Sequence, residues 1–144
     1  MSDLYETDIL LWSEQQAELL RRHAAGERTN DGAIDWPNIA EEIEDVGRSE
    51  RNSVASHLVQ ALLHDLKAEA WPLSREVPHW RAEARGHRDE ARRRFSPSMA
   101  QRIDVAKLYR EALRRMPETM DDTPPLPVPP ACPVTLAELL AEPE

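Results

Sequence analysis

The chain has one cysteine, four glycines and no long apolar run, and each of these shortages excludes or disfavours a class of structure. Because Cys132 has no second cysteine to pair with, no disulfide can form within the chain, which favours the reducing cytoplasm. No apolar stretch approaches the ~20 residues of a membrane-spanning helix, and the first residues, MSDLYETD, lack a basic-then-apolar secretory pattern. Few glycines and few β-branched residues, beside many Ala, Leu, Glu and Arg, favour helix over strand. We therefore expect an all-α cytoplasmic protein that does not enter the membrane.

The motifs of common enzyme classes are also missing. The sequence has no phosphate-binding loop, no Gly-x-Gly-x-x-Gly, no Gly-x-Ser-x-Gly and no zinc-type cysteine pair. These absences favour a protein that is not an enzyme, with no catalytic residue and no cofactor.

Charge is distributed unevenly along the chain. Residues 1–70 carry 15 acidic and 6 basic side chains, residues 71–116 carry 6 and 12, and residues 117–144 carry 6 and none. The arginines of the basic block, residues 71–116, are concentrated in the Arg-rich segment 81–115, which resembles a nucleic-acid footprint. The acidic blocks on either side supply more than enough carboxylates to neutralise it. We therefore expect these arginines to meet carboxylates of the same molecule, and we expect no nucleic-acid partner.

Helical periodicity predicts an antiparallel bundle of about four main helices in a single domain, residues 1–144. The first helix carries one apolar stripe from Tyr5 to His23, with Gln16 in its middle. The second is long and central, residues 36–70, with Asp35 as its N-cap and Gly47 as a weak point. Its segment 58–66 is apolar nearly all round, which is typical of a helix with neighbours on more than one side.

The second half of the chain predicts two shorter helices and an extended segment. A third helix follows Pro78, with His87 among its inner residues, and Ser96 with Pro97 begins a fourth that ends at Pro117. Six prolines between Pro124 and Pro133 predict an extended proline-rich strap over residues 118–133. Thr135 and Glu138 then form a capping box for a short last helix, LAELL.

Polar residues seven apart form a stripe on the expected buried face of the central helix. Glu50, His57 and His64 share that face with Ile43, because seven residues return to nearly the same direction. Buried polar groups need hydrogen-bond partners. We interpret the stripe as a buried hydrogen-bond network of Gln16, Glu50, His57, His64 and Tyr109. The alternative is a metal site in which other helices add ligands such as His87 or Glu83.

A second metal candidate lies on the third helix. His79, Glu83 and His87 are four residues apart in turn, and such side chains can share a divalent ion. A solvated helix edge is the commoner explanation, so we expect no metal there either.

Five segments resemble a known bacterial family, the "domain of unknown function" family number twenty-nine. They are LYETDILLWSEQQAELLR, NIAEEIEDVGRSERNSVASHLVQALLHDLK, HWRAEARGHR, SPSMAQ and CPVTLAELL, and they span nearly the whole chain in order. The resemblance implies an all-helical, bundle-like domain and implies no activity.

Three functions remain open from the sequence. The leading hypothesis is a small cytoplasmic protein-interaction domain, with self-association into a homo-oligomer as one form of that interaction. The alternative is a metal-binding or metal-dependent hydrolase-like bundle using His57, His64, His87 and Glu50, and a weaker one is nucleic-acid binding.

Overall fold

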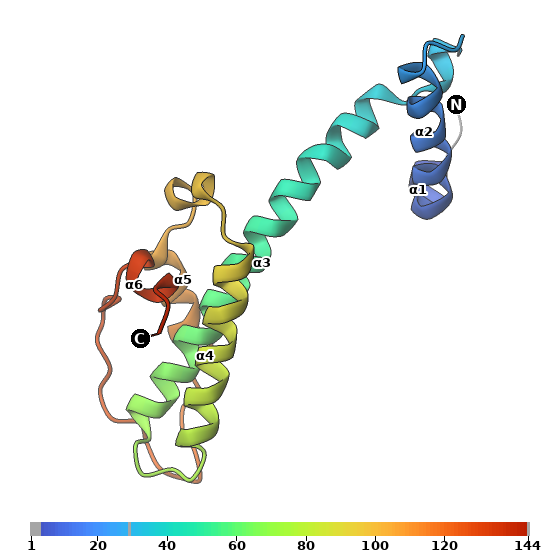
Figure 1. Cartoon of the computed structure of the whole chain (residues 1–144). Coiled ribbons are helices and arrows are strands. Elements are labelled where there is room, and N and C mark those ends of the chain that lie inside the picture. The colour runs from blue at the N-terminus through green and yellow to red at the C-terminus, as the bar shows by residue number, and fades with distance from the viewer. Residues whose placement is uncertain (1–3, 29, 144) are drawn as a thin grey trace. The chain divides into compact units, whose positions relative to one another are not determined.

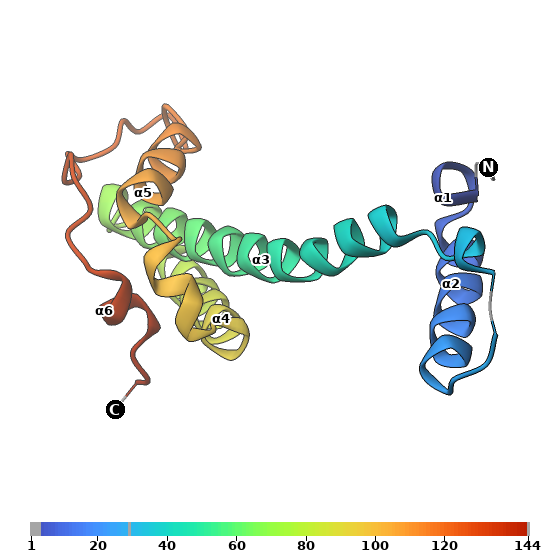
Figure 2. The ribbon, with the colours of Figure 1, turned by 90° about the horizontal axis from the view of Figure 1, so that it is seen from above.

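The structure is a computed structural model that describes residues 4–28 and 30–143, and of Asp31 only the backbone. Within these residues the regular structure is helical and no β-strand is present, so the all-α prediction is confirmed (Figures 1 and 2). Contacts divide the chain into two compact units, Met1–Gly47 (unit 1) and Arg48–Glu144 (unit 2). The prediction of a single domain stays a prediction. No helix in the described part of the chain has the length and apolar character of a membrane span.

Unit 1 begins with two helices where the sequence predicted one. Helix α1 is Leu4–Thr7 and helix α2 is Ile9–Ala24, separated by Asp8. Asp8 has an extended φ of -151°, and its side chain accepts a hydrogen bond from the backbone N–H of Leu11. An aspartate with this geometry is an N-cap, and it starts a new helix inside a continuous apolar stripe.

The core of unit 1 is small. Its buried hydrophobic side chains are Trp12 and Ile34, and the ring of Tyr5 packs edge-on against Trp12. The indole N–H of Trp12 donates to Asp35 Oδ2 at 3.2 Å. Asp35 also accepts from the backbone N–H of Asn38, which confirms it as the N-cap of helix α3. A short 3₁₀ helix, Asp31–Ala33, lies before it.

Helix α3, Trp36–Ala70, is helical through Gly47, so the glycine does not break it. The predicted buried face is wrong in its first third, because Ile43 and Val46 are each 68% exposed. Burial begins at Val54. From there to Ala70 both sides of the helix are covered, which confirms the prediction for residues 58–66.

Unit 2 is built on the pairing of α3 with helix α4, Val77–Arg94. The two helices are antiparallel, since Arg94 contacts Glu50, His87 contacts His57 and Arg81 contacts Asp65. Figure 2 shows α4 beside the second half of α3. On the inner face of α4, Trp80, Ala84 and Ala91 are buried, and His87, expected among the inner residues, is half-buried.

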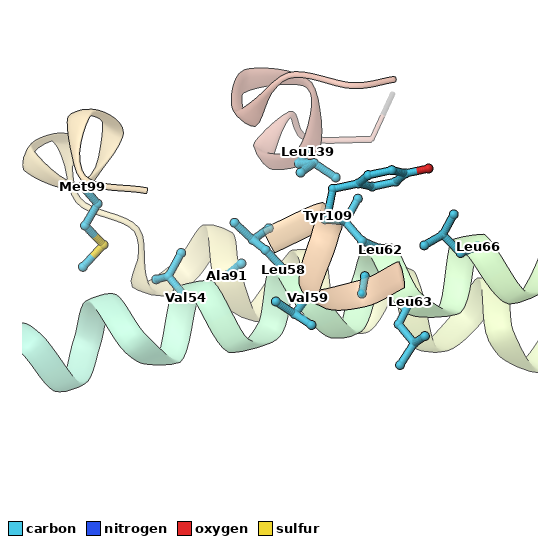
Figure 3. Packing of buried hydrophobic residues seen from close by; sticks show 11 residues of the cluster. Val54, Leu58, Val59, Leu62, Leu63, Leu66, Ala91, Met99, Tyr109 and Leu139 are labelled. Atoms are coloured by element: carbon cyan, nitrogen blue, oxygen red, sulfur yellow. The ribbon is translucent and has the colours of Figure 1, made fainter. Parts of the chain in front are cut away.

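The predicted fourth helix is two elements. A 3₁₀ helix, Pro97–Gln101, is followed by helix α5, Val105–Arg114. Asp104 caps α5 by accepting from the backbone N–H groups of Ala106 and Lys107, whereas the side chain of Ser96 makes no cap bond. Met99 and Tyr109 of these elements are buried, and Ala106 is exposed. Figure 3 shows Tyr109 packed over α3 in the main hydrophobic cluster.

The strap over residues 118–133 has no helix or strand and is only partly as predicted: Met120–Thr123 forms a tight turn in which Asp121 and Asp122 have positive φ, and the proline-rich part follows it. Hydrogen bonds hold the strap to the bundle. The hydroxyl of Tyr109 donates to the carbonyl of Pro129 at 2.6 Å, and the indole N–H of Trp71 donates to that of Thr123 at 2.9 Å. Helix α6, Leu136–Leu140, follows with the predicted capping box of Thr135 and Glu138. Leu139 anchors it in the main cluster.

Candidate functional site

Three histidines and a glutamate meet on one side of the α3–α4 pair. His57 and His64 lie on α3, two turns apart, while Glu83 and His87 lie one turn apart on α4. The His87 ring is nearly parallel to that of His64, with centroids 5.9 Å apart, and its centroid is 5.2 Å from that of His57. We call these four residues the histidine cluster.

Two polar contacts order the cluster. Nδ1 of His57 and Nδ1 of His87 are 2.9 Å apart, a hydrogen bond in which one ring donates and the other accepts. On its other side, Nε2 of His87 lies 3.8 Å from a carboxylate oxygen of Glu83. His87 is therefore the central member, with a different partner at each ring nitrogen.

Burial favours the neutral form of the two α3 histidines. Desolvation lowers the pKa of His57, and the nearby His87 ring lowers it further. Desolvation also lowers the pKa of His64, and Lys67 one turn away acts in the same direction. Nδ1 of His64 is buried and has no hydrogen-bond partner. Neutral imidazoles with free lone pairs are good ligands for metal ions.

One ring nitrogen of His64, one of His87 and a carboxylate oxygen of Glu83 lie within 4.8 Å of one another. This set has the composition of a transition-metal site, with two imidazoles and one carboxylate. Of the sequence candidates, His57, His64, His87 and Glu83 are brought together. His79 is exposed in the first turn of α4 and is not part of the set.

The buried hydrogen-bond network that we predicted for the polar stripe, Gln16 and Tyr109 does not form as predicted. Gln16 hydrogen-bonds the backbone of Ala33 and Asp35 in unit 1, because the loop before α3 offers unpaired groups there. The side chain of Glu50 is 47% exposed and reaches Arg94, since α3 is not yet covered at that turn. Tyr109 donates to the strap instead of to a histidine.

The sequence reasoning missed a charge cluster on the adjacent side of the same helices. Asp65 accepts hydrogen bonds from both Arg81 and Arg88, and its own side chain is largely buried. Desolvation lowers the pKa of Arg88, and Nε of that residue is buried without a partner. The available signal was an aspartate inside the apolar run 58–66, which needs a basic partner when that run is buried.

The other arginines follow the prediction in part. Arg94 pairs with Glu50 of α3, but Arg93 and Arg114 pair with glutamates of their own helices, and Arg115, the C-cap of α5, pairs with Glu111. Arg92 contacts Asp89 and donates to the carbonyl groups of Leu140 and Ala141 in the tail. No ion pair within the described residues involves four further exposed arginines of the block, Arg75, Arg85, Arg102 and Arg110.

Comparison with known proteins gives a family and no activity. The model of the family "Domain of unknown function DUF29" matches residues 4–143. A solved structure, an α-helical protein of unknown function from Rhodospirillum rubrum ATCC 11170 at 1.45 Å resolution, is 26% identical to this chain. The match covers 99% of this chain and 92% of the other, with a TM-score of 0.67. No curated protein matches the chain.

Proposed function

The chain belongs to the DUF29 family, whose function is unknown, and we propose that it is a small cytoplasmic protein-interaction domain without catalytic activity. Unit 1 supplies the interaction surface, and a second copy of the chain is the partner. The observation that carries this proposal is the exposed apolar surface of unit 1.

Unit 1 leaves more large apolar side chains in solvent than it buries. In the described part of the chain, eight large hydrophobic residues are exposed, and six belong to unit 1: Ile9, Leu10, Leu11, Trp36, Ile43 and Val46. Its buried hydrophobic residues are Trp12 and Ile34. Exposed apolar residues in such number, around so small a core, are typical of a surface that another protein covers.

The charge of unit 1 indicates what kind of partner surface would cover it. Residues 1–47 carry 12 acidic and 3 basic side chains, a net charge of -9. A shallow hollow along α2 combines both properties, with Leu11 and Leu19 beside Glu14 and Glu18. Such a surface fits a partner that offers apolar and basic groups together.

A second copy of the chain offers such groups. Residues 71–116 have a net charge of +6, and Arg85, Arg102 and Arg110 are exposed there. When unit 1 of each copy lies on the basic segment of the other, two equal interfaces form and the assembly closes as a dimer. This reciprocity is why we favour a second copy over an unrelated basic protein.

Sedimentation velocity over a wide range of protein concentration tests the proposal. The wild type is expected to form a dimer that weakens as salt is raised, because salt screens the attraction between acidic and basic surfaces. The double substitution Ile43→Glu and Val46→Glu places two more charges on one side of α3 and is expected to abolish the dimer.

The matched control is Leu73→Glu, which also adds a charge at an exposed leucine but lies in unit 2. Leu73 is 97% exposed, so this variant is expected to fold and to dimerise as the wild type does. A wild type that stays monomeric throughout contradicts the proposal. Equal loss of dimer in the control and in the double variant contradicts the assignment to unit 1.

A further inference from the structure

We propose that the histidine cluster binds one divalent transition-metal ion, of which Zn²⁺ is the type, through His64, Glu83 and His87. His57 is a positioning residue that holds the His87 ring in its metal-binding tautomer. The site is independent of the interaction surface of unit 1, since all four residues belong to unit 2.

The argument begins with the hydrogen bond between His57 and His87. A neutral imidazole carries one ring proton, so one Nδ1 donates and the other accepts across the 2.9 Å contact. If His57 donates, His87 carries its proton on Nε2, and that proton faces Glu83. The distance from Nε2 to the carboxylate is 3.8 Å, too long for a hydrogen bond, so this arrangement leaves the proton poorly paired.

The opposite tautomer leaves an electron-rich site. If His87 donates from Nδ1, its Nε2 has a lone pair that faces the negative carboxylate of Glu83. A cation between these two atoms turns a repulsion into two favourable contacts. A metal-ligating histidine usually donates its other N–H to a neighbouring acceptor, and His57 is that acceptor here.

His64 completes the ligand set. Its Nδ1 is buried without a hydrogen-bond partner, although a buried polar nitrogen normally has one. One of its ring nitrogens lies within 4.8 Å of the ligand atoms of Glu83 and His87. Donor atoms around a tetrahedral Zn²⁺ at ~2.1 Å lie about 3.4 Å apart, so modest side-chain rotations close the site.

The surroundings allow an ion to enter and leave. The side chains of His87 and Glu83 are 26% and 45% exposed, so the open side of the set faces solvent. Two imidazoles and a carboxylate suit Zn²⁺ and its neighbours better than Mg²⁺ or Ca²⁺, which prefer oxygen ligands. Three protein ligands leave a fourth position for water.

Calorimetric titration of the full chain, purified without an affinity tag and stripped with chelator, tests the site with Zn²⁺ alone. One ion per chain is expected. Glu83→Gln and His64→Ala are expected to weaken binding by at least about 100-fold, because losing an outer-shell partner alone costs 10–100-fold. Glu83 is half-exposed, so the glutamine variant keeps the fold intact. Circular dichroism checks this for each variant.

Matched control variants remove an imidazole or a carboxylate outside the histidine cluster. His23→Ala deletes a histidine of α2, and Glu76→Gln neutralises an exposed carboxylate beside the start of α4. Both are expected to bind Zn²⁺ as the wild type does, and so is the double variant at Ile43 and Val46. Binding that falls as much in these controls as in Glu83→Gln overturns the site.

His57 is tested by rescue. His57→Leu removes the acceptor for His87 and is expected to weaken Zn²⁺ binding 10–100-fold, whereas His57→Gln retains an acceptor oxygen and is expected to restore most of it. The visible spectrum of bound Co²⁺ gives a second readout of ligand geometry, and it should change in the leucine variant only. A wild type that binds no Zn²⁺ or Co²⁺ overturns the proposal and leaves a metal-free histidine pair.

Discussion

Asp35 shows how much of unit 1 depends on a single carboxylate. It accepts hydrogen bonds from the side chain of Asn38 at 2.8 Å, from the indole of Trp12 and from the backbone of Asn38. The first of these is the main reason that the pKa of Asp35 lies below its usual 3.8, and the Trp12 bond acts in the same direction. One residue thus caps α3 and fixes the central side chain of the unit 1 core.

A pH dependence follows from this lowered pKa. The unfolded chain takes up the proton at a higher pH than the folded one, so the stability that Asp35 contributes is complete above about pH 4 and is lost as the pH falls through the folded pKa. Asp35→Asn keeps a capping side chain and should reduce this loss, whereas Asp35→Ala should cost about 0.5–2 kcal/mol at neutral pH. The indole N–H resonance of Trp12 reports both the acid-induced loss and the cost of the alanine substitution. An unchanged acid profile in Asp35→Asn contradicts the assignment.

Tyr109 makes a comparable contribution in unit 2. Its ring is almost fully buried and its hydroxyl donates to the carbonyl of Pro129. Tyr109→Phe leaves that carbonyl without its partner and should lower the free energy of unfolding by about 1 kcal/mol in denaturant titration. Tyr5→Phe, which removes a more exposed bond to Glu42, should have the smaller effect. The reverse order would show that the strap is not held through Tyr109.

At the scale of helices, local sequence signals predicted where a helix starts better than where it is interrupted. Asp35 and the Thr135–Glu138 box were read correctly because each precedes a new apolar pattern. Asp8 and Asp104 were missed, since each lies inside a stripe whose apolar period continues on both sides. In such places a cap competes with continued helix, and tertiary packing decides the outcome.

The candidate site was predictable in its members and not in its pairing. A short connection between two helices makes them antiparallel neighbours, and the metal alternative accordingly named His87 or Glu83 as ligands that another helix could add. The register that sets His87 against His57 depends on how side chains interlock, which one sequence does not reveal. The exposure of Ile43 and Glu50 was equally hidden, because periodicity marks an apolar face but not the partner that covers it.

The centre of α3 carries the core of unit 2, and Leu62 tests this. Leu62 is buried among residues of the main cluster, with Tyr109 and Leu139 among its members (Figure 3). Leu62→Ala should leave a cavity and cost about 2–5 kcal/mol in denaturant unfolding. Leu73→Ala, at an exposed position, should cost little. Similar values for the two variants would mean that this turn of α3 is not the centre of the core.

At the scale of the whole molecule, charge decides between partner classes. The basic segment has 12 basic side chains, but 21 acidic ones lie in the rest of the chain and repel a phosphate backbone. We predict no DNA or RNA binding tighter than the micromolar range at about 0.15 M salt. Gel-shift titration with single- and double-stranded oligonucleotides checks this. Submicromolar binding lost on changing Arg92, Arg93 and Arg94 to Glu would favour a nucleic-acid function.

The central claim, that unit 1 of one copy lies on the basic segment of another, is tested most directly by paramagnetic relaxation between two differently labelled chains. A nitroxide is attached at Ser13→Cys on α2, in a chain whose Cys132 is replaced by Ala, and this chain is mixed with wild type enriched in nitrogen-15. Only the enriched chain is observed, so any broadening is intermolecular. The proposed dimer predicts broadening of amide signals in α4 and α5 around Arg85, Arg102 and Arg110. Spectra without localised broadening, recorded at concentrations at which the wild type forms dimers, would contradict the proposed dimer.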